Sequence, residues 1–341
     1  MDYRSSGVDI DAGNETVRRI RGLARATFTP GVLSDIGSFG GLFHVGAAGI
    51  RDPVLVASAD GVGTKLKVAF LANRHDTVGA DLVNHCVNDI LVQGAAPLFF
   101  LDYLATGRLA PDVAEQVVAG MARACRENGC ALLGGETAEM PGFYDDGEYD
   151  LAGFIVGAVE RHRLVNGTTL VPGDVLIGLS STGLHTNGYS LARRIVFERL
   201  GLRVDNHVPE LDATIGEALL AVHKSYLSAV RPLLDRQLAK GLAHITGGGI
   251  TENLPRIFAE GVGAEIDLST WEVPALFRLL QQGGGVTDEE MFRAFNMGIG
   301  LIVACDARYS SEVLAMLRDA GEKDARVIGG LVAGERRVEY V

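Results

Sequence analysis

Residues 53–65 combine an apolar run, Pro53-Val54-Leu55-Val56-Ala57, with the loop Asp60-Gly61-Val62-Gly63-Thr64-Lys65. The apolar run predicts a buried strand, and the glycines after it let backbone N–H groups approach an anion. In such a loop Asp60 can bind a divalent cation and Lys65 can neutralise phosphate charge. The spacing differs from that of a Walker loop, and an Asp-Gly pair after a strand is often only a turn. The rest of the chain therefore has to decide whether this is a phosphate and metal site.

Composition limits the kinds of protein that this chain can be. It has 341 residues, of which 47% are apolar and 22% are charged. A prior of roughly 150 residues per domain predicts two domains with a large core. The net charge is −12 and there is no block of Lys and Arg, which argues against a nucleic-acid or anionic-membrane surface. Small phosphorylated ligands remain compatible, because backbone amides and single cations bind them whatever the net charge.

The cysteines and the N-terminal residues indicate a cytoplasmic protein. The four cysteines are scattered and form no C-x-x-C pair, so we expect buried free thiols in a reducing compartment. The first residues contain no apolar segment of the signal-peptide kind, and no run approaches the ~18 apolar residues of a membrane helix. We therefore expect neither secretion nor membrane insertion.

Strand-like and helix-like segments alternate along the chain, which predicts an α/β fold, with α+β features, in two domains. In the first half the expected elements are a helix over 76–93, a strand over 98–101, a helix that Pro111 opens, and strands over 131–133 and 151–159. Turn residues cluster between residues 165 and 173 and predict the domain boundary there. We assign residues 1–168 to the first domain and 169–341 to the second.

The second half repeats one pattern twice: a strand, a Gly-rich loop and a helix. The strand over 175–179 leads into the loop Ser180–Gly188 and a helix through Leu200, and His244–Gly249 precedes a helix from about Thr251 to Phe258. Each loop places hydroxyl and N–H groups at a helix N-terminus, which favours an anion. For either loop alone, N-capping in a tight turn is the competing interpretation. Two such loops, each with a histidine, favour a substrate site.

Two more carboxylates and a glycine-rich segment complete the candidate residues. Glu136 follows a predicted strand beside glycines, as Asp60 does, and Asp89 lies late on the helix over 76–93. Three carboxylates at one edge would suit Mg²⁺, which takes oxygen ligands and bridges phosphates. A helix-face charge or a cap is the alternative for each one alone. The segment Gly37–Phe43 is interpreted as a mobile flap or a plain surface loop.

In this order the segments resemble one family, phosphoribosylformylglycinamidine cyclo-ligase, from about residue 7 to the C-terminus. Two departures are visible: Met297 stands where Cys is common, and 221–224 differ from a version with proline or threonine. The segments that carry the resemblance are Gly7–Asn14, Phe39–Gly41, Asp60–Lys65, Cys86–Asp89, Leu98–Tyr103, Gly134–Pro141, Gly183–Ser190, His244–Gly249 and Phe295–Gly298.

The resemblance implies that residues 1–168 form an ATP-binding and dimerisation domain and residues 169–341 a substrate-binding α/β domain. It implies a homodimer in which the N-terminal halves pair their sheets into a central barrel, with ATP sites near the subunit contact. It also implies a reaction of de novo purine biosynthesis: formylglycinamidine ribonucleotide and ATP give aminoimidazole ribonucleotide, ADP and phosphate. Transfer of the γ-phosphoryl group to the formyl oxygen makes a leaving group that the substrate's own nitrogen displaces. The protein then has to position the reactants and neutralise charge, and no Ser or Cys nucleophile is required.

Site residues follow from the loops and the resemblance together. We expect Asp60 and Asp89, with Glu136 as a weaker third, to bind Mg²⁺, and His185, His244 and Lys65 to take part in catalysis; K⁺ is an optional further cation. The expected ATP-binding residues are Gly40, Gly41, Asp60, Gly61, Gly63, Thr64, Lys65 and Asn88. The expected substrate-binding residues are Ser181, Thr182, Asn187, Gly188, Thr246, Gly247 and Gly248. A buried, hydrogen-bonded histidine is the alternative for His185 and for His244.

Other functions remain open, because related ATP-binding proteins share the first half. Selenide, water dikinase typically carries a reactive Cys or selenocysteine near its N-terminus, and residues 1–30 contain no cysteine. The hydrogenase-maturation relatives end in a Cys-bearing tail, whereas this chain ends Val338-Glu339-Tyr340-Val341. A nucleotide-binding module without turnover is the alternative from a different class. ATP hydrolysis that depends on an acceptor would exclude it.

Overall fold

The computed structural model describes residues 9–37 and 40–341. The chain forms two compact units, one of residues up to Ile90 with Ala95–Arg161, the other of Leu91–Gly94 with His162–Val341. The division falls ahead of the boundary that we predicted between residues 165 and 173. The short segment Leu91–Gly94 joins the second unit because Leu91 and Val92 pack into its core.

The first unit contains a four-stranded mixed sheet in the order β1-β4-β2-β3. β1–β4 and β4–β2 are antiparallel, and β2–β3 is parallel. The parallel pair needs a crossover, which the helix between β2 and β3 supplies. The strands are β1 (Pro53–Gly61), β2 (Ala96–Thr106), β3 (Ala131–Glu139) and β4 (Tyr149–Glu160).

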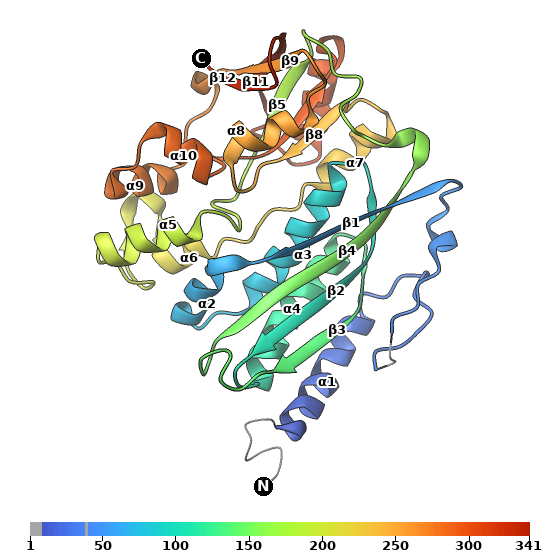
Figure 1. The fold of residues 1–341 in the computed structure, drawn as a ribbon, viewed down its shortest axis with the longest axis vertical. Helices are drawn as coiled ribbons and strands as arrows, with labels where there is room; N and C mark the ends of the chain where they lie inside the picture. Colours follow the sequence, from blue (N-terminus) through green and yellow to red (C-terminus); the bar gives the residue numbers. More distant parts are fainter. Residues whose placement is uncertain (1–8, 38–39) are drawn as a thin grey trace. The chain divides into compact units, whose positions relative to one another are not determined.

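Helices cover one face of this sheet (Figure 1). Two of them approach closely, because Gly79 and Gly120 have no side chain: a Cβ on Gly79 would lie 2.0 Å from the carbonyl oxygen of Val117. Leu82 and Ile90 of α3 reach β4 at its glycines Gly153 and Gly157. The helices are α1 (Ile10–Arg25), α2 (Leu66–Ala72), α3 (Asp76–Leu91) and α4 (Pro111–Glu127), with 3-10 turns at Val45–Ala48, Gly63–Lys65 and Arg161–Arg163.

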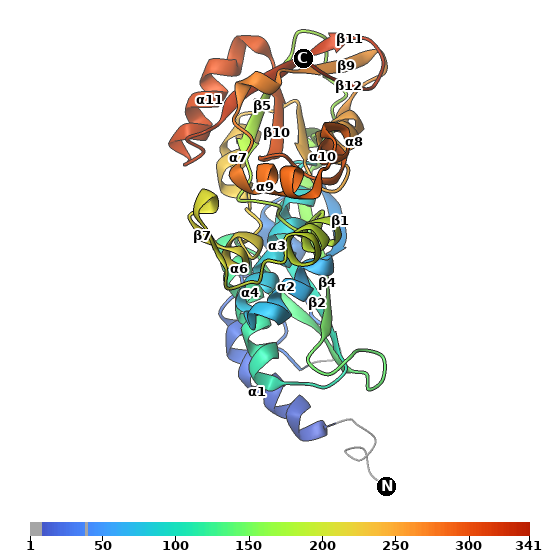
Figure 2. The ribbon, with the colours of Figure 1, turned by 90° about the vertical axis from the view of Figure 1, so that its left-hand side faces the viewer.

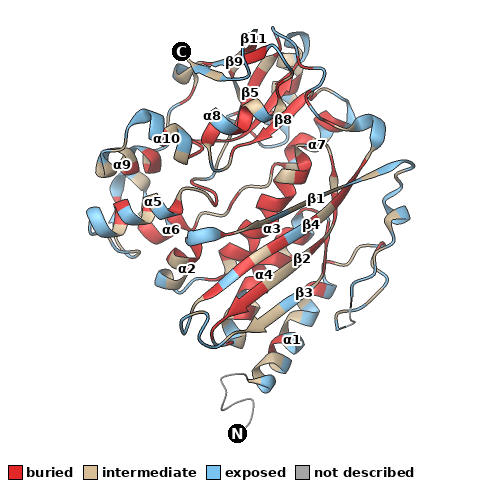
Figure 3. Cartoon of the chain, in the orientation of Figure 1, coloured by how far each residue is buried: buried red, intermediate tan, exposed pale blue. Residues whose placement is uncertain are grey.

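The opposite face of the sheet is apolar and open. Along β1 exposed residues alternate with half-buried ones, and Leu55 on the exposed set is 57% exposed. Phe154 of β4 is 45% exposed and pairs with Ala59, which places it on the same face as Leu55. The Phe43 ring covers part of this face by packing on Phe99, with 5.3 Å between ring centroids. Figure 3 shows exposed and half-buried residues along β1 and, between buried ones, along β4, whereas β8 of the second unit is buried throughout.

The second unit contains a six-stranded sheet in the order β12-β9-β11-β5-β10-β8. Its pairs are antiparallel except β12–β9. The strands are β5 (Val175–Ser180), β8 (Gly241–His244), β9 (Val262–Ile266), β10 (Ile299–Cys305), β11 (Arg326–Ala333) and β12 (Val338–Tyr340), and β6 (His207–Val208) pairs separately with β7 (Ala213–Thr214).

Helices bury this sheet on both faces. One core joins Ile177 and Leu301 to α7 (Leu227–Asp235) and α11 (Ser310–Asp319). Figure 2 shows α7 and α11 beside β5 and β10. The alternate residues of the same strands, such as Ile302, join Ile250 and Leu254 in a second core. Every residue of β10 is therefore buried. The remaining helices are α5 (Tyr189–Arg193), α6 (Ile215–Leu219), α8 (Gly249–Asn253), α9 (Ala275–Gly284) and α10 (Asp288–Ala294), with short 3-10 segments at Pro209–Leu211, Leu268–Thr270 and Ala307–Tyr309.

The predicted α/β elements are present, but several differ in extent: α3 ends at Leu91, β2 covers Ala96–Thr106 and β3 continues to Glu139. Three further differences affect the loops. β1 continues to Gly61, so Asp60 lies inside the strand and not in the loop after it. α5 continues as a π-helical turn, Arg194–Arg199. α8 ends at Asn253 and is followed by a 3-10 turn over Leu254–Ile257, because Pro255 cannot donate the hydrogen bond that a longer α-helix needs. Over the residues that the structure describes, no helix is long and apolar enough to cross a bilayer.

Candidate active site

The end of β1 holds Asp60 in a fixed orientation. The Gly61 N–H donates to Asp60 Oδ1 at 2.7 Å, and His85 Nε2 lies 2.9 Å from Asp60 Oδ2. After the strand, Gly63 adopts a φ of +63°, which glycine tolerates best, and starts the 3-10 turn to Lys65. Gly63 and Thr64 of the predicted phosphate loop are exposed.

Asp89 lies on the side of β1 that faces α3, one helical turn beyond His85. Ser58 Oγ donates to Asp89 Oδ2 at 2.9 Å, and His85 Nε2 is 3.9 Å from the same oxygen. The imidazole of His85 is thus shared between Asp60 and Asp89. The sequence identified both carboxylates, and the structure brings them together. Asn88, the neighbour of Asp89 on α3, is fully buried.

The pKa values of this cluster follow from its charges. Burial disfavours the cationic form of His85, but the hydrogen bond with Asp60 and the charges of Asp89, Asp60 and Asp81 outweigh burial and raise the pKa of His85. For Asp60, burial acts to raise the pKa, whereas the hydrogen bond and charge of His85 and the Gly61 N–H lower it, with a net lowering. The two carboxylates favour a positive charge between them and offer oxygen ligands. This donor set fits a divalent cation such as Mg²⁺.

Glu136 does not belong to this cluster within one chain, so our expectation of three carboxylates at one edge is wrong. β1 and β3 are the two edges of the sheet, with β4 and β2 between them. Three strand spacings amount to about 14 Å, far beyond the about 2.1 Å of a Mg–O bond. Asp60 aligns across the sheet with Gly153, Asp102 and Gly135, so Glu136, one residue further, projects from the opposite face. It lies exposed within β3 and not at the strand end.

Asp102 is a carboxyl that sequence reasoning left without a role. It is half-buried on β2 between two glycines, and a Cβ on Gly135 would lie 2.2 Å from Asp102 Oδ1. Burial raises the pKa of Asp102 to about 7, and the charge of Glu136 adds to this increase. The glycine beside it is the one signal in the sequence that could have drawn attention to this position.

Lys65 lies in an environment that the loop pattern does not predict. Its side chain is fully buried, and Nζ is 2.8 Å from Asp81 Oδ2, which is also fully buried. Burial lowers the pKa of Lys65, and the charge of Asp81 opposes this shift. In this arrangement the ammonium neutralises a protein carboxylate. Contact of Lys65 with a phosphate remains a prediction.

The glycine-rich segment is described from Gly40 onward, and Ser38 and Phe39 lie outside the described residues. Gly41 packs against β3, since a Cβ there would lie 2.4 Å from Leu133 Cγ. At Gly40 no atom of the described residues, its chain neighbours aside, lies within 4 Å of an added Cβ. The N-terminal part of the resemblance, Gly7–Asn14, is described from Asp9, whose side chain caps α1. The assignment of Gly40 and Gly41 to ATP stays a prediction.

Two asparagines hold the Gly-rich loops of the second unit. Asn296 accepts from Ser181 Oγ at 3.0 Å and donates through Nδ2 to the Gly183 carbonyl at 2.9 Å. Asn253 donates through Nδ2 to the carbonyls of Gly247 and Gly249, at 3.1 and 2.8 Å. Both asparagines are buried, so the loop conformations are tied to the core.

The two loops approach each other at Asn187 and Gly247. A Cβ on Gly247 would lie 3.2 Å from Asn187 Oδ1. Gly188 and Gly248 are the N-cap residues of α5 and α8, with φ of 77° and 96° and no side-chain hydrogen bond to the helix. The structure therefore gathers the predicted substrate residues at one place in the second unit. Their contact with substrate stays a prediction.

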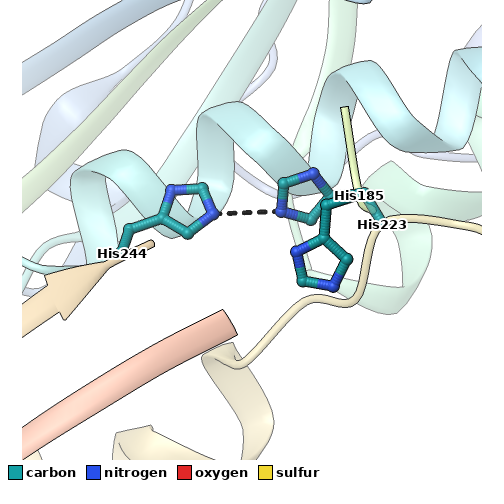
Figure 4. A group of neighbouring side chains, drawn as sticks. All are labelled: His185, His223 and His244. Carbon is teal, nitrogen blue, oxygen red and sulfur yellow. Dashed lines mark hydrogen bonds between the residues drawn. The ribbon is translucent and has the colours of Figure 1, made fainter. Parts of the chain in front are cut away.

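The predicted histidines belong to a buried group of three, which Figure 4 draws. His185 adopts a φ of +61°, rare for a residue with a side chain, and its Nε2 accepts from the Thr182 N–H at 3.2 Å. The rings of His185 and His223 stack at 4.0 Å and 20°. His223 Nε2 lies 3.0 Å from His244 Nε2, and His223 Nδ1 lies 3.3 Å from Thr186 Oγ1.

One nitrogen from each histidine lies within 4.8 Å of the others, a set that could be considered for a metal ion. Imidazole ligands point their lone pairs at the ion within the plane of the ring. The rings of His185 and His223 are stacked, with 4.0 Å between their centroids and 20° between their planes, so these lone pairs do not converge. A tetrahedral nitrogen site of the zinc kind would need one ring to turn.

Sequence reasoning missed several residues that shape these sites. His85 and His223 lack a motif of their own, although residues 221–224 were recognised as a departure from the family pattern. Asn296 lay inside a quoted segment without a role. Gly300 on β10 leaves room for the histidine group, since a Cβ there would lie 2.6 Å from His185 Cε1 and 2.1 Å from Tyr226 Oη. These roles depend on contacts between distant parts of the chain.

Comparisons with known proteins agree with this arrangement. Residues 46–159 match the family AIR synthase related protein, N-terminal domain, and residues 171–341 match AIR synthase related protein, C-terminal domain. The phosphoribosylformylglycinamidine cyclo-ligase of Trichlorobacter lovleyi is 55% identical over 94% of this chain and 92% of its own length. The chain belongs to the phosphoribosylformylglycinamidine cyclo-ligase family. The enzyme of the same name from Geotalea daltonii is 51% identical and aligns with 100% of this chain and 99% of its own.

A solved structure shares the fold of this cyclo-ligase family member at low identity. Hydrogenase maturation protein HypE, crystallised in complex with ATP, has a TM-score of 0.65 and 20% identity, covering 93% of this chain and 88% of that one. At this identity the likeness establishes the two-domain α/β fold alone. The resemblance that we stated from the sequence is confirmed by the family matches and the curated relatives.

Proposed function

We propose that this chain catalyses the ATP-dependent closure of formylglycinamidine ribonucleotide to aminoimidazole ribonucleotide, with release of ADP and phosphate, in de novo purine biosynthesis. The observation that carries the proposal is its full-length similarity to cyclo-ligases, at 55% and 51% identity. The two sets of polar loops, one in each unit, supply the groups that such a reaction needs. The reaction belongs in the cytoplasm, where free thiols such as those of the four buried cysteines stay reduced.

The proposed reaction needs no nucleophile from the enzyme, because the substrate's own oxygen and nitrogen make both new bonds. The formyl amide oxygen attacks the γ-phosphorus of ATP, the bond to the β-phosphate oxygen breaks, and ADP leaves. The substrate's own nitrogen then attacks the activated carbon, and the carbon–oxygen bond breaks to release phosphate. The protein positions the reacting atoms and stabilises the charge that develops.

The phosphate end of ATP is assigned to the first unit. Asp60 and Asp89 hold Mg²⁺, with Ser58 fixing the orientation of Asp89. Bound Mg²⁺ neutralises phosphate charge in the transferring group. The exposed Gly63 and Thr64 lie after Asp60, and the Gly63 amide is assigned to the phosphates. Gly61 is kept as a nucleotide residue, although its N–H donates to Asp60 Oδ1 in the structure. Crystallisation of the related fold with ATP supports this assignment. The proposal extends to Gly40, Gly41, Asn88 and Lys65 at the nucleotide, and to K⁺ as an optional cation.

Formylglycinamidine ribonucleotide is assigned to the loops of the second unit. Ser181, Thr182 and Asn187 offer side-chain hydrogen bonds, and the backbone of Gly188, Thr246, Gly247 and Gly248 offers further donors and acceptors. His185 and His244 lie beside these loops and can move a proton or stabilise the phosphorylated amide. In the enzyme we further propose a homodimer that pairs the open faces of the first-unit sheets into a barrel.

One assay tests the proposal. The protein is mixed with Mg-ATP and formylglycinamidine ribonucleotide, and aminoimidazole and ADP are measured together. We expect one ADP per ring closed and little hydrolysis without substrate, because in-line transfer needs the acceptor oxygen in place and water fills that place poorly. ADP without aminoimidazole would defeat the proposal and favour a phosphotransferase of the same fold.

The variant Asp60→Asn supplies the matched control for the metal assignment. It keeps the size of the side chain but removes a charge from the proposed Mg²⁺ ligands. Loss of turnover with an unchanged circular dichroism spectrum is the expected result. Wild-type turnover in Asp60→Asn would remove Asp60 from the metal site while leaving the cyclisation itself untouched.

A further inference from the structure

His223 connects the two histidines that lie beside the substrate loops. It is fully buried, stacks on His185, and places Nε2 3.0 Å from His244 Nε2. His185 and His244 are also buried, at 1% and 6% exposure. The three rings come from the loop after β5, the segment before α7 and the end of β8, so the fold brings them together from distant parts of the chain (Figure 4).

The short distance between the two Nε2 atoms restricts the protonation of the His223–His244 pair. Two imidazole nitrogens at 3.0 Å form a good hydrogen bond when one of them carries a hydrogen and the other offers its lone pair. Two N–H groups would clash at this distance, and two lone pairs would repel each other. One hydrogen therefore lies between the two Nε2 atoms, bonded either to His223 or to His244.

The hydrogen bond at His223 Nδ1 can form whether the shared proton is bonded to His223 or to His244. Nδ1 lies 3.3 Å from Thr186 Oγ1, and a hydroxyl can accept from an N–H or donate to a lone pair. When His223 carries hydrogens on both nitrogens, Nδ1 donates to Thr186 and Nε2 donates to His244. A cationic His223 thus has acceptors for both of its N–H groups, and it stacks on the ring of His185.

We propose that His223 is a positioning residue that receives the shared proton from His244 during ring closure. The inference rests on the proposed function, in which His244 serves the substrate. When the substrate's attacking nitrogen gives up its proton, that N–H bond breaks and a new one forms at His244 Nδ1; the Nε2–H bond of His244 then breaks and a new N–H bond forms at His223 Nε2. Total charge is conserved and nothing is oxidised or reduced. The positive charge moves from His244 to His223, so His244 is neutral again and keeps its orientation.

Two measurements test this proposal in the full-length protein. The first is the scalar coupling between the two Nε2 nuclei in ¹⁵N-histidine-labelled protein, which reports an N–H···N hydrogen bond directly and does not require activity. The second is kcat and KM for aminoimidazole formation in His223→Gln. Gln can hydrogen-bond to His244 but cannot take up its proton. His207→Gln, at an exposed position of the same unit, is the matched control.

We expect the coupling in the wild type and its loss in His223→Gln. We also expect kcat to fall between about tenfold and a hundredfold, below the full range of general acid–base catalysis, with KM within about twofold. In His223→Ala, added imidazole should restore part of kcat, which a purely structural role would not allow. His207→Gln should leave all of these values unchanged. If His223→Gln does not fold, the coupling and the rescue of His223→Ala still decide the matter.

Absence of the coupling in the folded wild type would overturn the proposal. So would an unchanged kcat in His223→Gln, because the hydrogen bond would then have no part in turnover. If the wild type forms no aminoimidazole, the proposed function fails and the role of His223 in ring closure fails with it. The coupling would then still decide whether the two rings share a proton, so the two failures are distinguishable.

Discussion

At the scale of single residues, variants of the Lys65–Asp81 pair can distinguish an effect on stability from an effect on catalysis. Both side chains are fully buried and 2.8 Å apart. Removing one charge leaves the other buried without its partner, which typically costs 3–5 kcal/mol. We therefore predict that Lys65→Met lowers the free energy of unfolding by about that amount, measured by urea denaturation with ATP absent.

The double variant Lys65→Met with Asp81→Leu is the control for this prediction. It replaces both charges with apolar groups, which is often nearly neutral or stabilising, so most of the lost stability should return. The ATP KM of the double variant then shows whether the Lys65 ammonium also contacts the nucleotide. Recovery of stability without recovery of the ATP KM would assign the ammonium to the nucleotide, as the loop pattern predicts. A stable Lys65→Met single variant would contradict our account of the pair.

The pKa of His75 predicts how stability changes with pH. His75 is buried, with Nδ1 2.9 Å from Tyr149 Oη, and burial lowers its pKa while the charge of Asp76 opposes the shift. Protonation is then easier in the unfolded chain than in the folded one. The resulting stability is fully present above the ordinary histidine pKa of about 6.5 and is lost as pH falls through it toward the folded pKa.

We predict that replacing His75 with Gln flattens the acid side of the stability curve. Between pH of about 7.5 and 5.5 the wild type should lose more free energy of unfolding than His75→Gln does. Urea titrations at several pH values measure this difference. His207→Gln, at an exposed position, should follow the wild-type slope. Parallel curves for wild type and His75→Gln would show that this histidine does not contribute.

At the scale of elements, strand β10 leaves space for the histidine group because Gly300 has no side chain. A Cβ on Gly300 would lie 2.1 Å from Tyr226 Oη and 2.6 Å from His185 Cε1, so one of these side chains has to move in Gly300→Ala. Overpacking of this kind costs typically 1–3 kcal/mol. We predict a folded protein in which kcat falls about tenfold or more, since small displacements in an active site are costly.

Steady-state kinetics and a thermal melt of Gly300→Ala check this prediction. Gly334→Ala is the control, because no atom lies within 4 Å of an added Cβ there and its φ is not in the left-handed region. It should leave kcat and the melting temperature as in the wild type. A Gly300→Ala protein with unchanged kcat would mean that His185 either does not shift or does not matter.

Patterns along the chain predicted the elements better than the contacts between them. The spacing of Val83, Val87 and Ile90 indicates α3, and the apolar run after Asp174 indicates β5, because local periodicity determines each. Strand order is not local. Nothing near Glu136 tells that β3 and β1 are opposite edges of one sheet, and nothing near His223 tells that it meets His244. The loops were recognisable as sites, whereas their neighbours in space were not.

For the whole molecule, family membership assigns the reaction class more firmly than geometry does. Asp60 and Asp89 form a carboxylate pair that fits a cation, and Asn253 and Asn296 hold polar loops, but neither feature names a purine precursor. Relatives with full-length similarity at 51–55% identity supply that step. Substrate specificity arises from the placement of a few hydrogen bonds, which the sequence pattern of a loop does not encode.

The apolar face of the first-unit sheet predicts the oligomeric state. Helices cover one face, while the other exposes Leu55 and Phe154 at 57% and 45%. A contiguous apolar surface of this kind is rare on monomers and marks an interaction site. In a two-fold symmetric dimer both subunits contribute the same surface patch, so this one sheet face can form the whole interface. We predict that Phe154→Glu converts a dimer to a monomer, as measured by light scattering after size-exclusion chromatography.

Leu71→Glu is the matched control, since Leu71 is 59% exposed on α2 and away from the sheet face. Both variants place a charge at an exposed apolar position, so neither should lose secondary structure. Only Phe154→Glu buries a charge when two sheets meet, which costs far more than the contact gains. It should also lose turnover if the ATP site needs the partner. A Phe154→Glu protein that remains dimeric would place the subunit contact elsewhere and remove the barrel from the proposal.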